Sequence, residues 1–172
     1  MMKHLRYLKY VLKHKWYVLL QCWAYGLFWR GITHDLSKFY PSEWFAYADY
    51  FYGKKPPYQT DEIKQAFQKA WLHHQNRNRH HWQYWIEHKS DGMMLTFKMP
   101  DADVLEMVAD WVGAGHAITG KVDVWGWYKK NMDDMYLHTE TRARVETLLY
   151  ELGQKHGVEF KGAKWVMENR ES

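Results

Sequence analysis

The sequence predicts an all-α protein, and three observations lead to that fold class. Apolar side chains recur at the three- and four-residue spacing of a helix face in several stretches. Proline and glycine mark the ends of several of these stretches. Only one segment, near residues 92–99, shows the alternation of a short hairpin or an extended lid. At 172 residues, without repeats or a linker, the chain is expected to form a single domain, 1–172.

The first expected helix has two partly apolar faces, as in a helix near the centre of a bundle. One face carries Leu5, Leu8, Leu12, Trp16, Leu19 and Trp23. The opposite side carries His14 with Tyr7, Val18, Gln21 and Tyr25. Gly31 then marks a break before a short segment from His34 to Phe39.

The second expected helix begins at Pro41-Ser42 and runs towards Tyr52, before a loop over residues 53–59. Thr60, followed by two acidic residues, is a plausible cap for the third. That helix has an inward face of Ile63, Phe67, Ala70 and His74, and His81 returns to this face if the helix continues. Further helices are expected from Pro100-Asp101, over 122–132, and around Val145, Leu148, Leu149 and Leu152.

Composition narrows the class of protein. The single cysteine, Cys22, excludes an intrachain disulfide and fits a cytoplasmic location. The apolar run from Trp16 to Trp29 is interrupted by Gln21 and is too short for a membrane span of about 20 residues. We therefore interpret it as a buried helix, with no membrane partner expected. The net charge of +4 fits a small anionic substrate or nucleic acid without choosing between them, and the oligomeric state stays open.

Histidines carry the strongest functional signal. Four of the eleven fall within nine residues, as His73-His74 and His80-His81. An imidazole on an inward face must be hydrogen-bonded or ligated, because burying it unsatisfied costs about 1–3 kcal/mol. Imidazoles and carboxylates together are ligands for divalent transition metals. The spacing of His74 and His81, with Asn78 between them, favours a metal site over satisfied core histidines.

The segment His34-Asp35-Leu36-Ser37-Lys38 resembles the signature of the HD-domain superfamily of metal-dependent phosphohydrolases. More narrowly, HDLSKF, AWLHHQNRNRHHW and EMVADW resemble an uncharacterised bacterial and phage family related to the HD proteins. The resemblance covers about residues 10–115 and implies an HD-like helical bundle holding the metal site. Residues 120–172 would be a helical C-terminal extension without a counterpart in the superfamily.

The resemblance also implies a ligand set for two ions, of Mn, Fe, Ni, Zn or Co. Two departures are visible: Ser37 replaces a common glycine, and His74 and His80 are unusually close in sequence. The choice between His80 and His81 therefore stays open. The implied ligands are His14, His34, Asp35, His74, His80, His81 and Asp110.

Other residues are candidates for substrate contacts. Asp35 and Lys38 are the expected catalytic residues, with Lys38 contacting an anionic substrate oxygen; an exposed lysine without a role is the alternative. Arg77, Asn78 and Arg79 could clamp a phosphate or could form a solvated turn.

The acidic residues Asp103, Glu106 and Asp110 share one helix face, which by itself fits a solvated surface. With the upstream histidines, Asp110 is the best candidate to close the site, and Glu106 would support its ligands from behind.

The expected function is a metal-dependent phosphohydrolase acting on a nucleotide or another small phosphoester. Abundant aromatic residues could stack on a base. Two alternatives remain. HD-type di-iron oxygenases use the same ligands to activate O₂. A non-catalytic nucleic-acid-binding module would use the basic first helix and the stretch Arg77–Trp85.

Overall fold

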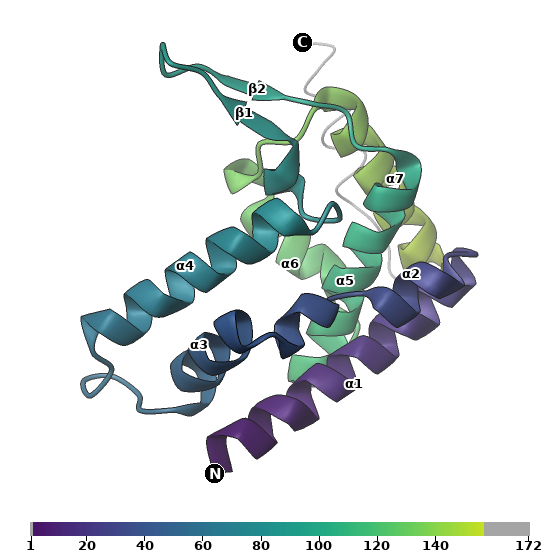
Figure 1. The fold of residues 1–172 in the computed structure, drawn as a ribbon. Coiled ribbons are helices and arrows are strands. Elements are labelled where there is room, and N and C mark those ends of the chain that lie inside the picture. The colour runs from purple at the N-terminus through teal and green to yellow at the C-terminus, as the bar shows by residue number, and fades with distance from the viewer. Residues whose placement is uncertain (1, 157–172) are drawn as a thin grey trace.

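A computed structural model describes residues 2–156, and within them the chain is mostly helical, as expected (Figure 1). The end of the expected C-terminal extension, residues 157–172, lies outside the described residues. The division into a metal-site core and an extension stays a prediction. The helices are α1 (Met2–Ala24), α2 (Phe28–Thr33), α3 (Pro41–Tyr52), α4 (Asp61–Arg77), α5 (Asp101–Thr119), α6 (Val124–Asn131) and α7 (Thr139–Lys155).

Helix α5 stands in the middle of the bundle, with α1 packed along it (Figure 1). One apolar core joins α5 to α6 and α7, and a second joins α1 to α3 and α4. Helices α1 and α5 approach closely at Gly113, where an added Cβ would lie 2.5 Å from Val18 Cγ2 and 3.0 Å from the Val18 nitrogen. This close approach fixes the position of one wall of the site relative to the other.

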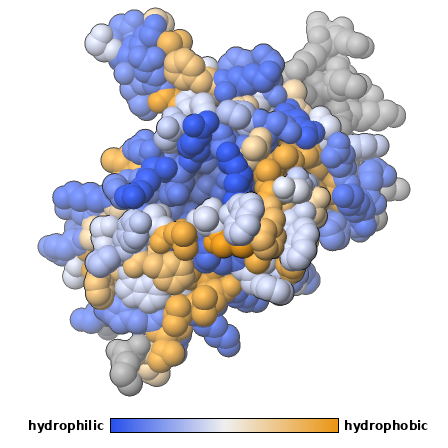
Figure 2. All heavy atoms as spheres, turned by 45° about the vertical axis from the view of Figure 1, so that its right-hand side comes forward, coloured by the Kyte–Doolittle hydropathy of each residue, from blue (hydrophilic) through white to orange (hydrophobic). Residues whose placement is uncertain are grey.

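Helix α1 buries one face only, which corrects the expectation of a helix apolar and buried on both sides. Its buried residues are Tyr7, Val11, His14, Val18 and Cys22. Most of the leucine and tryptophan stripe lies on the other side and stays exposed, although Trp23 contacts Phe28 of α2, with ring centroids 5.0 Å apart. Hydrophobic side chains accordingly appear on the surface along α1 (Figure 2). The exposed members of the stripe are Leu5, Leu12, Trp16 and Trp23.

Helix α4 begins at Asp61, as predicted, but it ends at Arg77 and does not continue to His81. Asn78 is extended, and its side-chain amide donates to the carbonyl oxygen of His74 at 2.8 Å. A turn follows, in which the backbone N–H of His81 donates to the Asn78 carbonyl at 3.1 Å. A short 3₁₀ helix, Trp82–Trp85, comes next. His81 therefore reaches the interior from a turn and not from the face of α4.

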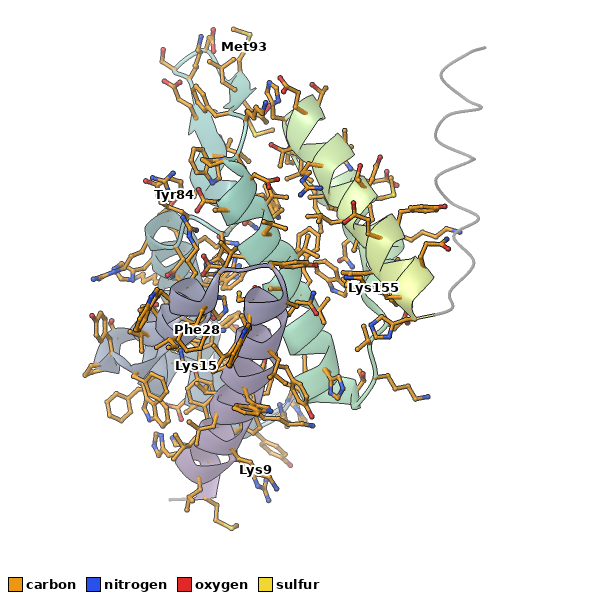
Figure 3. The ribbon with its side chains drawn as sticks, turned by 90° about the vertical axis from the view of Figure 1, so that its right-hand side faces the viewer. Lys9, Lys15, Phe28, Tyr84, Met93 and Lys155 are labelled. Atoms are coloured by element: carbon orange, nitrogen blue, oxygen red, sulfur yellow. The ribbon has the colours of Figure 1, made fainter. Side chains whose placement is uncertain are left out.

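The expected hairpin is present, formed by the antiparallel strands β1 (Ile86–His88) and β2 (Met94–Thr96), with Glu87 opposite Leu95. Only the second strand lies within residues 92–99, and the first strand precedes that segment, with the turn at residues 89–93 between them. Met93 lies at the far tip of the hairpin (Figure 3). In the described part of the chain, no helix is long and apolar enough to cross a membrane.

Candidate metal centre

The site is built around the turn that follows α2. Asp35 has φ of 53°, in the left-handed region that aspartate tolerates better than most residues. This conformation ends the path of α2 and starts a 3₁₀ helix at Leu36, and both His34 and Asp35 are buried at 2% exposure. Lys15, on α1 beside α2 (Figure 3), donates to the carbonyl oxygens of Ile32 and His34. The His34-Asp35 pair is thereby tied to α1.

The two carboxylate oxygens of Asp35 face different histidines. Oδ1 lies 3.3 Å from His74 Nε2 and 3.4 Å from His80 Nε2. Oδ2 lies 3.3 Å from His34 Nε2 and 3.6 Å from His14 Nε2. A carboxylate placed in this way can donate one oxygen to each of two cations.

All seven sequence-predicted ligands come together, in two sets that share Asp35. Within each set the candidate ligand atoms lie within 4.8 Å of one another. Asp110 joins the second set, with Oδ1 at 3.1 Å from His14 Nε2 and 3.3 Å from His34 Nε2. His80 and His81 both belong to the first set, so the geometry does not favour either. The sets are Asp35, His74, His80 and His81, and His14, His34, Asp35 and Asp110.

Apart from the Lys38 ammonium beside Asp35 Oδ2, these inward-facing atoms have no hydrogen-bond partner of good geometry among residues 2–156. The Nε2 atoms of all five histidines, and both carboxylate oxygens of Asp35, are buried without a hydrogen bond of acceptable geometry. Each buried polar atom that is left unsatisfied costs about 1–3 kcal/mol. A cluster of such atoms in one place therefore calls for an explanation. Imidazole nitrogen and carboxylate oxygen are the donors that Zn, Fe, Mn, Ni and Co accept. The residues therefore fit a pair of divalent transition-metal ions.

Carboxylates behind the histidines orient the rings. Glu43 Oε2 lies 2.8 Å from His74 Nδ1, and Glu106 Oε1 lies 3.0 Å from His34 Nδ1 and 3.3 Å from His80 Nδ1. A proton held on Nδ1 leaves the Nε2 lone pair directed inward. This arrangement is typical of histidines that bind metals.

The structure places Glu106 as expected, whereas sequence reasoning missed Glu43. Glu43 lies in the first turn of α3 and is fully buried. In the sequence it is indistinguishable from an acid that complements a helix N-terminus. Ser37, which replaces the common glycine, donates from Oγ to Glu43 Oε2 at 3.1 Å. The departure at Ser37 therefore contributes to the support of His74.

A network of ion pairs holds Glu106 in place. Arg30 Nη1 lies 3.0 Å from Glu106 Oε2 and 2.6 Å from Asp103 Oδ1. Asp103 is fully buried and also accepts from Arg79 at 3.1 Å. Asp103 is therefore not part of a solvated face, because it anchors two guanidinium groups from α2 and from the turn after α4.

Opposite charges within the cluster shift the pKa values of its members. Burial opposes ionisation of Asp35, but His34 and Lys38 hold the pKa of its carboxyl well below the usual range. Burial likewise disfavours charge on His34, yet Asp35 and Asp110 raise its pKa well above the ordinary value. Burial and the neighbouring His80 lower the pKa of His81 well below the ordinary value. Protons and the Lys38 ammonium, 2.5 Å from Asp35 Oδ2, thus balance the carboxylates.

The residues expected to clamp a phosphate, Arg77, Asn78 and Arg79, do not all face the ion cluster. Arg77 is exposed and its guanidinium lies 5.2 Å from the centre of the Tyr40 ring. Arg79 is paired with Asp103, and Asn78 is bonded to His74 and Ser37. Their substrate-binding role stays a prediction, whereas Lys38 lies at the cluster itself.

A cavity of about 580 Å³ reaches the cluster, and His81 and Asp110 contribute to its wall. Comparisons with known proteins give one match. The model of a protein family described as "Family of unknown function (DUF5662)" matches residues 3–151, which include every residue of the cluster. No curated protein and no solved structure matches the chain.

Proposed function

The chain belongs to the DUF5662 family, and we propose that it is a metal-dependent phosphohydrolase with two divalent ions that share Asp35. The observation that carries this proposal is the convergence of four buried Nε2 atoms on the two oxygens of Asp35, with His81 in the same group of candidate ligands. The order of these residues along the chain, with the His34-Asp35 pair between His14 and His74, also resembles that of two-metal HD proteins.

His74, His80, His81 and Asp35 would hold one ion, and His14, His34, Asp110 and Asp35 the other. When bound, such ions polarise a phosphoryl oxygen and make water a nucleophile at neutral pH. Glu43 and Glu106 keep the Nδ1 protons in place, so that the inward nitrogens stay available.

Lys38 supplies the positive charge beside the reacting group. It is nine-tenths buried, and the Asp35 carboxylate raises its pKa above the usual range in spite of burial. A cation held at this position stabilises negative charge on a phosphoryl group near Asp35. The substrate would be a nucleotide or another small phosphoester, since both present the anionic group that this charge arrangement accepts.

The test uses the full chain, stripped of metal and reloaded separately with Mn²⁺, Fe²⁺, Ni²⁺, Zn²⁺ or Co²⁺. We expect two ions per chain by elemental analysis and phosphate release from a panel of phosphoesters. Asp35→Asn should abolish both, whereas Trp29→Ala, an exposed control, should change neither.

Three results would overturn the proposal: metal-free protein that retains full phosphatase activity, substrate-dependent O₂ uptake without phosphate release, or nucleic-acid binding by a chain that takes up no metal.

A further inference from the structure

The cavity that ends at His81 and Asp110 is large enough for more than a phosphate. Its volume of about 580 Å³ falls within the range of about 300–1,000 Å³ found for small-molecule sites. Its remaining wall comes from Trp71 on α4, from α5, from the 3₁₀ segment at Trp82, and from α6 with the residues on either side of it. Helix α6, which lies beside α5 (Figure 1), belongs to the part of the chain that the HD resemblance does not cover.

Four tryptophans line this cavity: Trp71, Trp82, Trp111 and Trp127. Trp111 on α5 and Trp127 on α6 are in ring contact, with centroids 5.0 Å apart and planes inclined at 51°. Their indoles therefore present flat apolar surfaces on the side of the cavity contributed by α5 and α6. Trp71 packs against His74 and His81, with ring centroids at 5.7 and 5.3 Å. The aromatic wall thus continues to the ion-binding residues.

The two tryptophans of α6 lie in different surroundings. Trp125 is 7% exposed, and its indole N–H donates to the Leu149 carbonyl at 2.6 Å, so it belongs to the core. Trp127 is 42% exposed, and it lines the cavity while Trp125 does not. Core packing therefore accounts for Trp125, whereas much of the Trp127 ring stays available to a ligand.

The wall also carries polar residues away from the ion cluster: Gln83, Thr119, Asp123, Lys130, Asn131 and Asp134. Lys130 lies three residues after Trp127 and forms no ion pair among residues 2–156. Asp123 is occupied as the cap of α6, where it accepts from the Gly126 N–H at 3.0 Å. An aromatic wall that is bordered by polar side chains suits a flat organic ring with polar substituents.

We propose that this cavity holds the non-reacting part of the substrate, and that Trp127 makes the enzyme select phosphoesters that carry a flat aromatic group. Aryl phosphates and nucleoside monophosphates belong to this class, whereas sugar and alkyl phosphates do not. The proposal rests on the proposed function, because it assumes that the phosphoryl group lies at the ion cluster. Helix α6 would then set specificity without supplying a metal ligand.

The kinetic test compares adenosine 5′-monophosphate with ribose 5-phosphate, using the metal-loaded full chain. Stacking of a base on an aromatic side chain is sequence-tolerant and substantial. We therefore expect Trp127→Ala to raise KM for the nucleotide by about tenfold, with little change in kcat, and to leave KM for ribose 5-phosphate unchanged. Trp127→Phe should restore most of the affinity, and Trp29→Ala is the matched control. Equal KM values for the two substrates, unaffected by Trp127→Ala, would overturn the inference and leave the phosphohydrolase proposal intact.

A binding measurement separates the two proposals. Calorimetry with the same metal-loaded proteins should show tighter binding of adenosine 5′-monophosphate than of ribose 5-phosphate, and Trp127→Ala should remove the difference. If neither compound is hydrolysed but this difference is found, the phosphohydrolase proposal fails and the aromatic site stands. Absence of a difference, or a difference that Trp127→Ala leaves unchanged, overturns the site.

Discussion

Glu43 lies 2.8 Å from Nδ1 of His74, on the opposite side of the imidazole from Asp35. This contact joins α3 to α4 inside the protein and holds the ring in one orientation. Because a metal-binding histidine depends on the group that holds its second nitrogen, Glu43 affects a cation that it does not touch.

The first prediction follows from this contact. Glu43→Gln should weaken metal binding at the His74 set by about 10- to 100-fold, because the amide no longer favours a proton on Nδ1. A competition titration against a metal-sensitive chelator measures the loss. Glu62→Gln, which changes an exposed acid on α4, should bind metal as the unmodified chain does. Unchanged affinity in Glu43→Gln would contradict the assignment.

The second prediction concerns the buried pair of Asp35 and Lys38. Removing one partner of such a pair leaves an uncompensated charge, so Asp35→Asn should lower the free energy of unfolding of the metal-free protein by about 3–5 kcal/mol. Lys38→Met in the Asp35→Asn background should recover part of this loss. Urea denaturation of both single variants and the double variant gives the coupling energy. Strictly additive effects would argue against a direct interaction.

The third prediction tests the contact between α1 and α5. Gly113→Ala places a methyl group against Val18 and should destabilise the fold by about 1–3 kcal/mol. It should also weaken metal binding, since His14 on α1 and Asp110 on α5 then move apart. Gly115→Ala is the matched control on the same helix. Its added Cβ would meet only the Lys121 carbonyl at 3.8 Å, so we expect a gain of about 0.5–1 kcal/mol. Thermal denaturation followed by circular dichroism distinguishes the two.

The fourth prediction is a pH dependence of metal stabilisation. Burial opposes charge on His34, but Asp35 and Asp110 raise its pKa above the ordinary value. The resulting stability of the metal-free protein is complete below a pH of about 6.5, the unfolded value, and is lost as pH rises through the raised folded pKa. A metal ion binds only the deprotonated imidazole, so metal binding strengthens as the pH rises.

The difference in melting temperature between loaded and metal-free protein should therefore grow from pH 5.5 to pH 8. Differential scanning fluorimetry in matched buffers measures it. A difference that stays constant over this range would show that no imidazole proton is displaced.

Local signals in the sequence predicted most of the helices, but not α2, since Gly31 was expected to be a break and lies within that helix. The inward face of α4 pointed to His74, whereas the remaining ligands were implied by the resemblance of His34–Lys38 to the HD signature. Helix periodicity could not show which face of α1 is covered, because both faces carry apolar residues. That choice depends on how α2, α3 and α5 pack.

The sequence was less informative where tertiary contacts override local pattern. Periodicity suggested that α4 would continue to His81, but the side chain of Asn78 bonds back to the His74 carbonyl and the chain turns there. His81 approaches His74 all the same, with ring centroids 4.9 Å apart. Glu43 was missed for a related reason: it is 31 residues from His74, and nothing nearby in the chain records their contact.

The left-handed backbone at Asp35 restricts which replacements can be interpreted. The direction of the Asp35 carboxylate depends on the main chain as well as on its side-chain torsions. Most substitutions would therefore disturb both the turn and the groups that face the histidines. Glutamate would keep the acid but adopt this region poorly and extend too far. Asparagine alone combines the shape of aspartate with tolerance of a positive φ. The main chain thus leaves one substitution that removes the charge and keeps the turn, although it exchanges one carboxylate oxygen for an amide NH₂.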